Sequence, residues 1–88
     1  MRTIDNAQAK TIIDAEGLGG FAHFGPPDNG TVNKVCVFSH DGKWVTVSTD
    51  ERAVVLQATI REYETEGLAL TDFIDALRVI RSYQNFSR

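Results

Sequence analysis

The spacing of hydrophobic residues differs from one part of the chain to the next, and near the N-terminus it predicts a helix. From Thr3 to Glu16, apolar and small residues recur every three to four positions, as on one face of a helix. The expected buried stripe consists of Ile4, Ala7, Thr11 and Ala15, with Ile12 beside it. Thr3 or Asp5 is expected to cap the first turn, and Gly17 to end the helix in a left-handed conformation.

The clearest pattern lies between Val32 and Ser48, where two runs of β-branched residues flank a turn. Asp41-Gly42 suits a two-residue type I′ turn, because both central positions need a positive φ. This turn sets the register of an antiparallel hairpin and places Phe38 opposite Val45. The face expected to form the core carries Cys36, Phe38, Val45 and Val47. The other face is mixed and expected to be half exposed: Val35, Val37, Ser39, Trp44, Thr46 and Ser48.

The stretch Ala53–Tyr63 fits either a helix or a strand. Helical spacing relates Ala53, Leu56, Ile60 and Tyr63, and Ser48 with Glu51 has the spacing of a capping box. Strand-like alternation sets Val54, Leu56, Ala58 and Ile60 against Val55, Gln57, Thr59 and Arg61. A third strand is favoured, because a two-stranded hairpin alone is marginally stable in water.

A second helix is predicted from Thr65 to about Tyr83, with Thr71 as an alternative start because Gly67 weakens the first turn. Its apolar stripe is Leu70, Phe73, Ile74, Leu77 and Ile80. An additional edge strand is suggested by Phe21 and Phe24. These elements predict one α+β domain over residues 1–88, with an N-terminal helix, an antiparallel sheet of three to four strands, and a C-terminal helix packed on one sheet face.

Composition narrows the class of protein. The chain has 88 residues, is 42% hydrophobic and carries a net charge of −3, which argues against a nucleic-acid coat protein. Its single cysteine, Cys36, excludes an internal disulfide and fits a reducing compartment. Neither a signal sequence nor a membrane span is predicted, so a cytoplasmic protein is expected.

Residues that carry chemistry are few and poorly placed for catalysis. On one strand, Cys36 and His40 would stand ~13 Å apart, too far to share a proton. His23, His40 and Asp41 lack the spacing of metal ligands, and the glycines from Gly17 to Gly20 lack that of a phosphate-binding loop. We therefore expect no catalytic, cofactor or metal site.

Acidic residues between Asp50 and Asp75 suggest a docking surface. This stretch holds seven acidic residues and two arginines, a net charge of −5. It is either a solvated face or a surface that attracts a basic partner. The expected partner-binding residues are Glu62, Glu64, Glu66, Asp72, Asp50, Glu51 and Trp44. Trp44 itself fits either the core or an interface anchor.

Three segments resemble a family of small bacterial immunity proteins that accompany polymorphic and contact-dependent growth-inhibition toxins. They are Asp41-Gly42-Lys43-Trp44-Val45, Thr49-Asp50-Glu51-Arg52 and the helix Leu70–Arg78. Asp50, Glu51 and Arg52 match the marked residues of that family, and Ala53 stands where its members carry glycine. These residues either contact the partner or form a structural turn, in which Arg52 is expected to reach the carboxylate of Asp50 or Glu62.

The resemblance implies a non-enzymatic function. Such a protein would neutralise the C-terminal domain of a cognate toxin, often a nuclease, by forming a heterodimer in the cytoplasm. It would need no cofactor and would bind neither nucleic acid nor membrane. A general protein-interaction or adaptor module is the main alternative, followed by a small enzyme or ligand carrier that uses Cys36 or the histidines.

Overall fold

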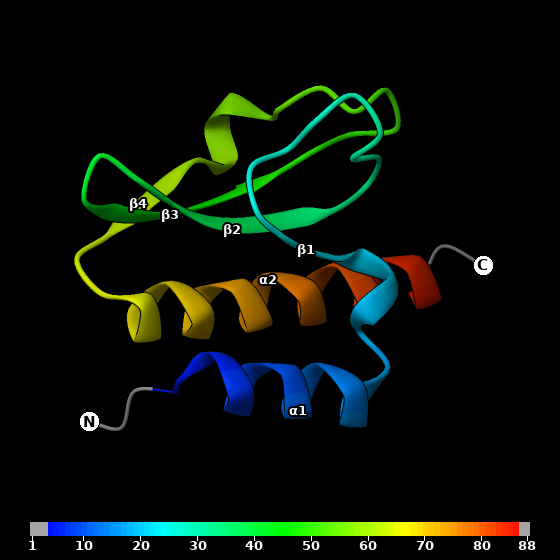
Figure 1. Ribbon diagram of the computed structural model, residues 1–88. Helices are drawn as coiled ribbons and strands as arrows, with labels where there is room; N and C mark the ends of the chain where they lie inside the picture. The colour runs from blue at the N-terminus through cyan, green and yellow to red at the C-terminus, as the bar shows by residue number, and fades with distance from the viewer. Residues whose placement is uncertain (1–3, 87–88) are drawn as a thin grey trace.

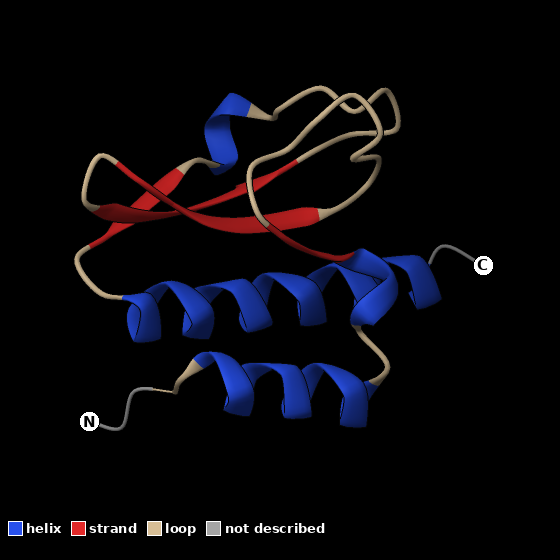
Figure 2. Ribbon diagram, viewed as in Figure 1, coloured by secondary structure: helices blue, strands red, loops and turns tan. Residues whose placement is uncertain are grey.

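Two helices and a four-stranded sheet make up the fold, in an α+β arrangement (Figure 1). The computed structural model describes residues 4–86, with side chains described up to residue 82. The elements are α1 (Asn6–Glu16), η1 (Gly19–Phe21), β1 (Ala22–Phe24), β2 (Val35–His40), β3 (Lys43–Ser48), η2 (Gln57–Thr59), β4 (Arg61–Tyr63) and α2 (Glu66–Phe86). Both helices lie on one side of the sheet, and the long loops with η2 lie on the other (Figure 2). The predicted fold class is confirmed.

The predicted hairpin is confirmed in its turn and in its register. Asp41 and Gly42 both have positive φ, 52° and 78°, as a type I′ turn requires. Phe38 lies opposite Val45, and Ser39 lies opposite Trp44. Two adjacent turn residues thus fix the central pair of strands in the sheet, whose order is β1-β2-β3-β4.

The sheet is mixed, so the prediction of a purely antiparallel sheet is wrong. β1 pairs in parallel with β2, with Ala22 beside Val35 and Phe24 beside Val37. After Phe24 the chain does not reverse in a tight turn but crosses the sheet in the loop 25–34 (Figure 1). β2 therefore starts at the same end of the sheet as β1. The predicted edge strand itself exists and includes Phe24.

Both faces of the central hairpin are buried, and the helices cover the mixed one. Val35, Val37 and Thr46 are at most 4% exposed, so the prediction of a half-exposed face is wrong for these three residues. It is right for the others, since Trp44 and Ser48 are partly exposed and Ser39 is exposed. Val35 and Val37 pack with α2 in the main core. Cys36 and Val45, on the opposite face, are also buried. Loops cover that second face, and strands buried on both sides lose a clean alternation of polar and apolar residues.

Helix α2 presents its predicted stripe to the core. Leu70, Phe73 and Leu77 are at most 1% exposed, and the Phe73 ring meets the Phe24 ring edge-on at 5.2 Å between centroids. The helix begins at Glu66, so the alternative start at Thr71 is wrong. Its first turn is held by the Thr65 hydroxyl, which accepts a hydrogen bond from the backbone N–H of Leu68.

Helix α1 has the predicted caps and a different buried stripe. The Asp5 carboxylate accepts from the Gln8 backbone N–H at 2.8 Å, and Gly17 ends the helix at a φ of 68°. However, Ala9 and Ile13 are the buried residues, and Ala7, Thr11 and Ala15 are exposed. The predicted stripe is right for Ile4 and Ile12, which pack against the core, and wrong for the three exposed residues. Packing against α2 selects the face, and α1 has few apolar residues to decide it beforehand.

An ion pair links the end of α1 to α2. The Arg78 guanidinium donates to both carboxylate oxygens of Glu16, with Nε at 2.8 Å from Oε1, and Arg81 donates to the backbone carbonyl of Glu16. The hydrogen bonds from Arg78 lower the pKa of Glu16 below its usual value. This carboxylate therefore stays ionised at neutral pH. The stability that its ion pair contributes to the fold is lost only as the pH falls through the lowered pKa.

The ambiguous stretch Ala53–Tyr63 is neither a full strand nor a helix. Only its last three residues, Arg61–Tyr63, form a strand, which pairs antiparallel with β3. Upstream, a single bridge joins Thr49 to Val55, and η2 follows. The Thr59 hydroxyl accepts a hydrogen bond from the Ser48 backbone N–H at 2.9 Å, where a strand would have offered a carbonyl. The strand prediction is therefore right only for β4.

Candidate functional site

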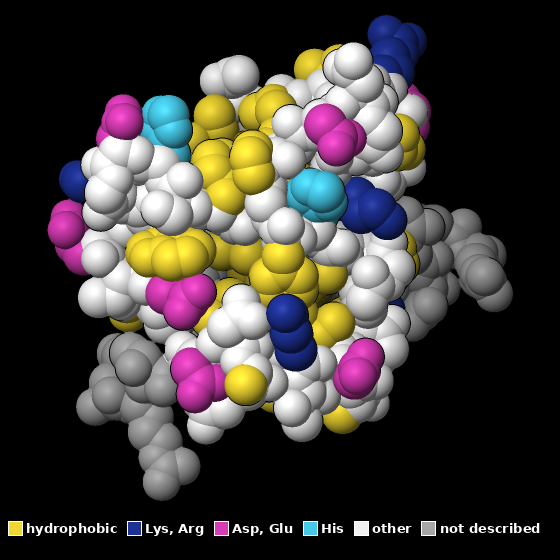
Figure 3. Space-filling model, in the orientation of Figure 1, with side chains coloured by type: hydrophobic (Ala, Val, Ile, Leu, Met, Phe, Trp, Pro, Cys, Tyr) yellow, Lys and Arg dark blue, Asp and Glu magenta, His cyan; other side chains and the backbone are white. Residues whose placement is uncertain are grey.

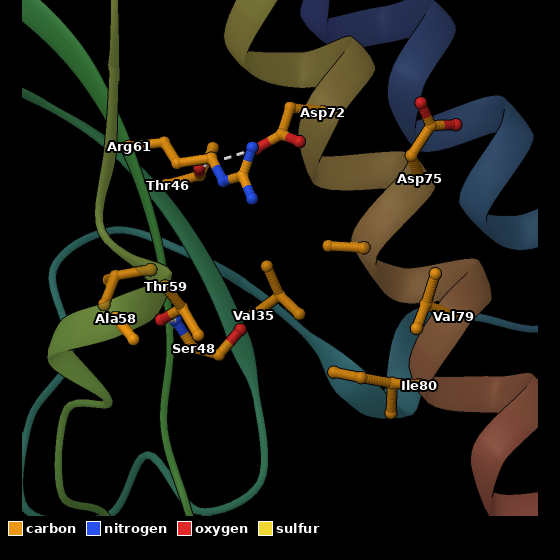
Figure 4. A pocket seen from close by; sticks show the side chains of 12 residues that line it. Val35, Thr46, Ser48, Ala58, Thr59, Arg61, Asp72, Asp75, Val79 and Ile80 are labelled. Carbon is orange, nitrogen blue, oxygen red and sulfur yellow. Dashed lines mark hydrogen bonds between the residues drawn. The ribbon is translucent and has the colours of Figure 1, made fainter.

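A groove runs between α2 and the segment that precedes β4. It consists of two adjoining hollows of about 350 and 390 Å³, which share Ser48, Thr59, Val79 and Ile80 in their walls. Figure 4 shows the first hollow, with Val79 and Ile80 of α2 across from Ala58 and Thr59. We call this feature the α2 groove.

Apolar side chains are exposed on both sides of the α2 groove. Val79, on α2, is 67% exposed, and Leu56, in the opposite wall, is 40% exposed. Val54 and Ile60 lie exposed in the same stretch as Leu56, which we call the 54–60 segment. Of these exposed residues, Leu56 and Val79 line the same hollow, whereas Ile60 lines a separate hollow on the loop side of the sheet. Single exposed hydrophobic residues are normal, but two that lie across one groove from each other form a candidate binding surface.

A turn at Asp50 places the start of this segment. The Asp50 carboxylate oxygen Oδ1 accepts hydrogen bonds from the backbone N–H groups of Arg52, at 2.8 Å, and Val54, at 3.0 Å. These two bonds, that from Val54 first, lower the pKa of Asp50, so the carboxylate is ionised at neutral pH. Asp50 is thus a structural residue that also leaves a negative charge at the end of the groove.

Ala53 adopts a left-handed conformation within this turn, with a φ of 62°. That conformation favours glycine, because the Cβ atom of other residues crowds the following carbonyl. We expect Ala53→Gly to raise the free energy of unfolding by about 0.5–1 kcal/mol, after the greater freedom of glycine in the unfolded chain is subtracted. Urea unfolding of the two proteins measures the difference. A variant less stable than the wild type would contradict the strained turn.

The other end of the groove is polar. The Thr46 hydroxyl donates to the Asp72 carboxylate at 2.9 Å, and Arg61 points from β4 toward Asp72 (Figure 4). Burial raises the pKa of Tyr63, and the neighbouring Asp72 carboxylate adds to that shift. Asp72 is therefore partly committed to holding α2 on the sheet.

The predicted acidic residues do not form one patch. Glu62 lines a separate hollow on the loop side of the sheet, and Glu66 lines a cleft together with Trp44. Glu64 pairs with Lys43 at 3.5 Å. On the face shown in Figure 3, acidic and basic side chains are likewise scattered around a hydrophobic centre. Of the predicted residues, the α2 groove brings together Asp50, Glu51 and Asp72.

Two further predictions concern Arg52 and Trp44. Arg52 is exposed and forms no ion pair with Asp50 or Glu62 in the described part of the chain, so the predicted contact is wrong. Trp44 is half-buried and packs against the main core, and it also lines the cleft that contains Phe24. Its contact with the core is confirmed, and its role as an interface anchor stays a prediction.

The apolar walls of the groove were not predicted from the sequence. The 54–60 segment has the alternation of a buried strand, which hides its exposure. Val79 gives a better signal, because it lies off the core stripe Leu70–Leu77 yet is apolar and β-branched in a helix. An apolar residue on the outer face of an amphipathic helix is the pattern that indicates such a surface.

The remaining candidates for catalysis or metal binding, Cys36 and the histidines with Asp41, do not form a common site in the described part of the chain. Cys36 is fully buried, and burial raises the pKa of its thiol to about 11, so it is not a reactive thiolate at neutral pH. His40 lies beside Asp41 at the hairpin turn, with its Nε2 atom 3.4 Å from Oδ2 of Asp41. Among the described residues, no three His, Cys, Asp or Glu side chains are grouped to hold a metal ion.

Comparison with protein-family models, with curated proteins and with solved structures finds no match for this chain. Within residues 4–86, neither helix combines the length and the apolar character needed to cross a membrane.

Proposed function

We propose that this chain is a non-enzymatic binding protein that acts by forming a stoichiometric complex with another protein through the α2 groove. The observation that carries the proposal is the exposure of Leu56 and Val79 on opposite sides of one groove. Burying such side chains against a partner removes apolar surface from water and stabilises the complex. The hydrogen-bonded turn at Asp50 supports the proposal, because a wall held in place loses little entropy on binding.

The partner we propose is the toxin domain of a bacterial growth-inhibition system, and this protein is its immunity protein in the cytoplasm. The hairpin around Trp44, the turn Asp50-Glu51-Arg52 and the part of α2 from Leu70 to Arg78 carry the resemblance to such proteins. An acidic protein suits a nuclease toxin, whose active-site cleft must attract phosphates with basic side chains. The complex would then be a heterodimer in which this chain blocks or distorts the toxin.

Titration calorimetry with the toxin domain encoded directly upstream tests the proposal. We expect tight one-to-one binding by the wild type, and an affinity at least about 100-fold lower for Val79→Asp, since a charge replaces an apolar contact in the interface. Leu68→Asp is the matched control, because Leu68 is an exposed apolar residue of α2 that does not line the groove. This control should bind like the wild type.

Growth protection provides the second readout. Cells that express the toxin domain should survive with the wild type or Leu68→Asp and die with Val79→Asp, at equal levels of folded protein. The proposal fails if the toxin domain and the wild type form no complex. It also fails if both substitutions leave binding unchanged, because the interface would then lie away from the groove.

A further inference from the structure

The end of the α2 groove nearest Glu51 is lined by both apolar and acidic side chains. Its lining combines the apolar side chains of Leu56, Val79 and Ile80 with the carboxylates of Asp50 and Glu51. The other lining residues are polar and uncharged: Asn33, Ser48, Thr49 and Thr59. This hollow measures about 390 Å³. We call it the Glu51 pocket.

The charged side chains that line the Glu51 pocket are both acidic, and the positive charge of Arg52 acts on Asp50 from outside the lining. Among the described residues no lysine or arginine lines it, and Glu51 forms no ion pair with any of them. Asp50 uses the oxygen Oδ1 for both turn hydrogen bonds, which leaves its Oδ2 without a described donor. Two carboxylates and an apolar surface therefore line one hollow without a cationic side chain among the described lining residues.

A long cationic side chain complements both parts of this pocket. The methylene stem of arginine packs on apolar surface while its charged head stays near water. Its planar guanidinium offers several N–H donors and can contact two carboxylates at once, which the compact ammonium of lysine does less well. An apolar side chain would contact the apolar part of the lining but leave both carboxylates facing an uncharged group.

We propose that the Glu51 pocket takes an arginine side chain of the protein partner, with the stem on Leu56 and Val79 and the guanidinium between Asp50 and Glu51. This proposal rests on the proposed function, since it names the chemistry by which the partner is recognised. It makes the pocket a determinant of specificity, because a partner with an uncharged side chain at that position loses the carboxylate contacts.

Peptide titration followed by NMR tests the pocket without knowledge of the partner. The probe is acetyl-Leu-Arg-Leu-amide at millimolar concentration, and acetyl-Leu-Gln-Leu-amide is its uncharged counterpart. We expect the arginine peptide to shift the amide signals of residues 50–56 and 79–80, and to bind about three- to fivefold more tightly than the glutamine peptide. Glu51→Gln should remove most of that difference. Glu62→Gln, which removes one charge outside the groove, should preserve it.

Two results would overturn the proposal: equal binding of the two peptides, or a preference for arginine that Glu51→Gln leaves unchanged. Failure of this proposal is distinguishable from failure of the proposed function. A toxin domain that binds wild type and Glu51→Gln equally, and Val79→Asp weakly, refutes the arginine site and retains the groove. A toxin domain that does not bind the wild type refutes the function itself, whatever the peptides do.

Discussion

Val45→Asp is expected to lower the free energy of unfolding by about 3–5 kcal/mol, enough to unfold much of the protein at room temperature. Val45 is 6% exposed and lies on the loop-covered face of the sheet, with Phe38 on one side and Glu62 on the other. A carboxylate there is buried without a partner and lies beside the like charge of Glu62. Urea unfolding followed by Trp44 fluorescence measures the loss.

Ser39→Asp is the control for this substitution. Ser39 is exposed on the neighbouring strand, so the same carboxylate remains in water and should change stability by no more than about 1 kcal/mol. Equal stability of Val45→Asp and the wild type would mean that the loops do not seal this face. The sheet would then have one buried face instead of two.

Phe73→Ala is expected to lower the free energy of unfolding by about 3–5 kcal/mol. Phe73 is completely buried between α2 and the sheet, and its ring meets that of Phe24 at an interplanar angle of 68°. The substitution removes this aromatic contact and leaves a cavity that the neighbouring residues cannot close fully. Thermal and urea unfolding provide two independent measurements.

Val79→Ala is the matched control on the same helix. Because Val79 is 67% exposed, its truncation should change stability by no more than about 0.5 kcal/mol. The pair of variants separates the two faces of α2: one face holds the fold together, and the other lines the groove. Similar losses in both variants would contradict that division.

Local chemistry explains which elements were predictable from the sequence. Asp41-Gly42 fixes a turn within two residues, and the register of the hairpin follows from it. Asp5 and Gly17 likewise act through hydrogen bonds and φ angles in their immediate vicinity. The stripe of α2 is long and strongly periodic, so its buried side was also predictable.

Elements that depend on distant packing were not predictable in the same way. The parallel pairing of β1 with β2 spans the loop 25–34, and no local pattern distinguishes it from an antiparallel neighbour. The buried side of α1 is chosen by its contact with α2, where Ala9 and Ile13 meet the core. In both cases the deciding energy comes from residues far along the chain.

The candidate site was predictable in part of its charge but not in its apolar walls. Of the six acidic residues expected to bind a partner, three line the α2 groove: Asp50, Glu51 and Asp72. The alternation of residues around Leu56 predicts a strand. The left-handed Ala53 and the hydrogen bond from Ser48 to the Thr59 hydroxyl divert the backbone from a regular ladder, and neither is evident from spacing alone.

The short edges of the sheet have a consequence for self-association. β1 and β4 each contain three residues, and β1 is followed by Gly25-Pro26-Pro27, in which the prolines have no N–H to offer to an incoming strand. At the other edge, the 3-10 turn η2 interrupts the extended conformation of the backbone just before β4 begins. Neither edge provides a long, regular template for growth into fibrils, so apolar residues such as Leu56 can remain at the surface without inviting aggregation through strand pairing.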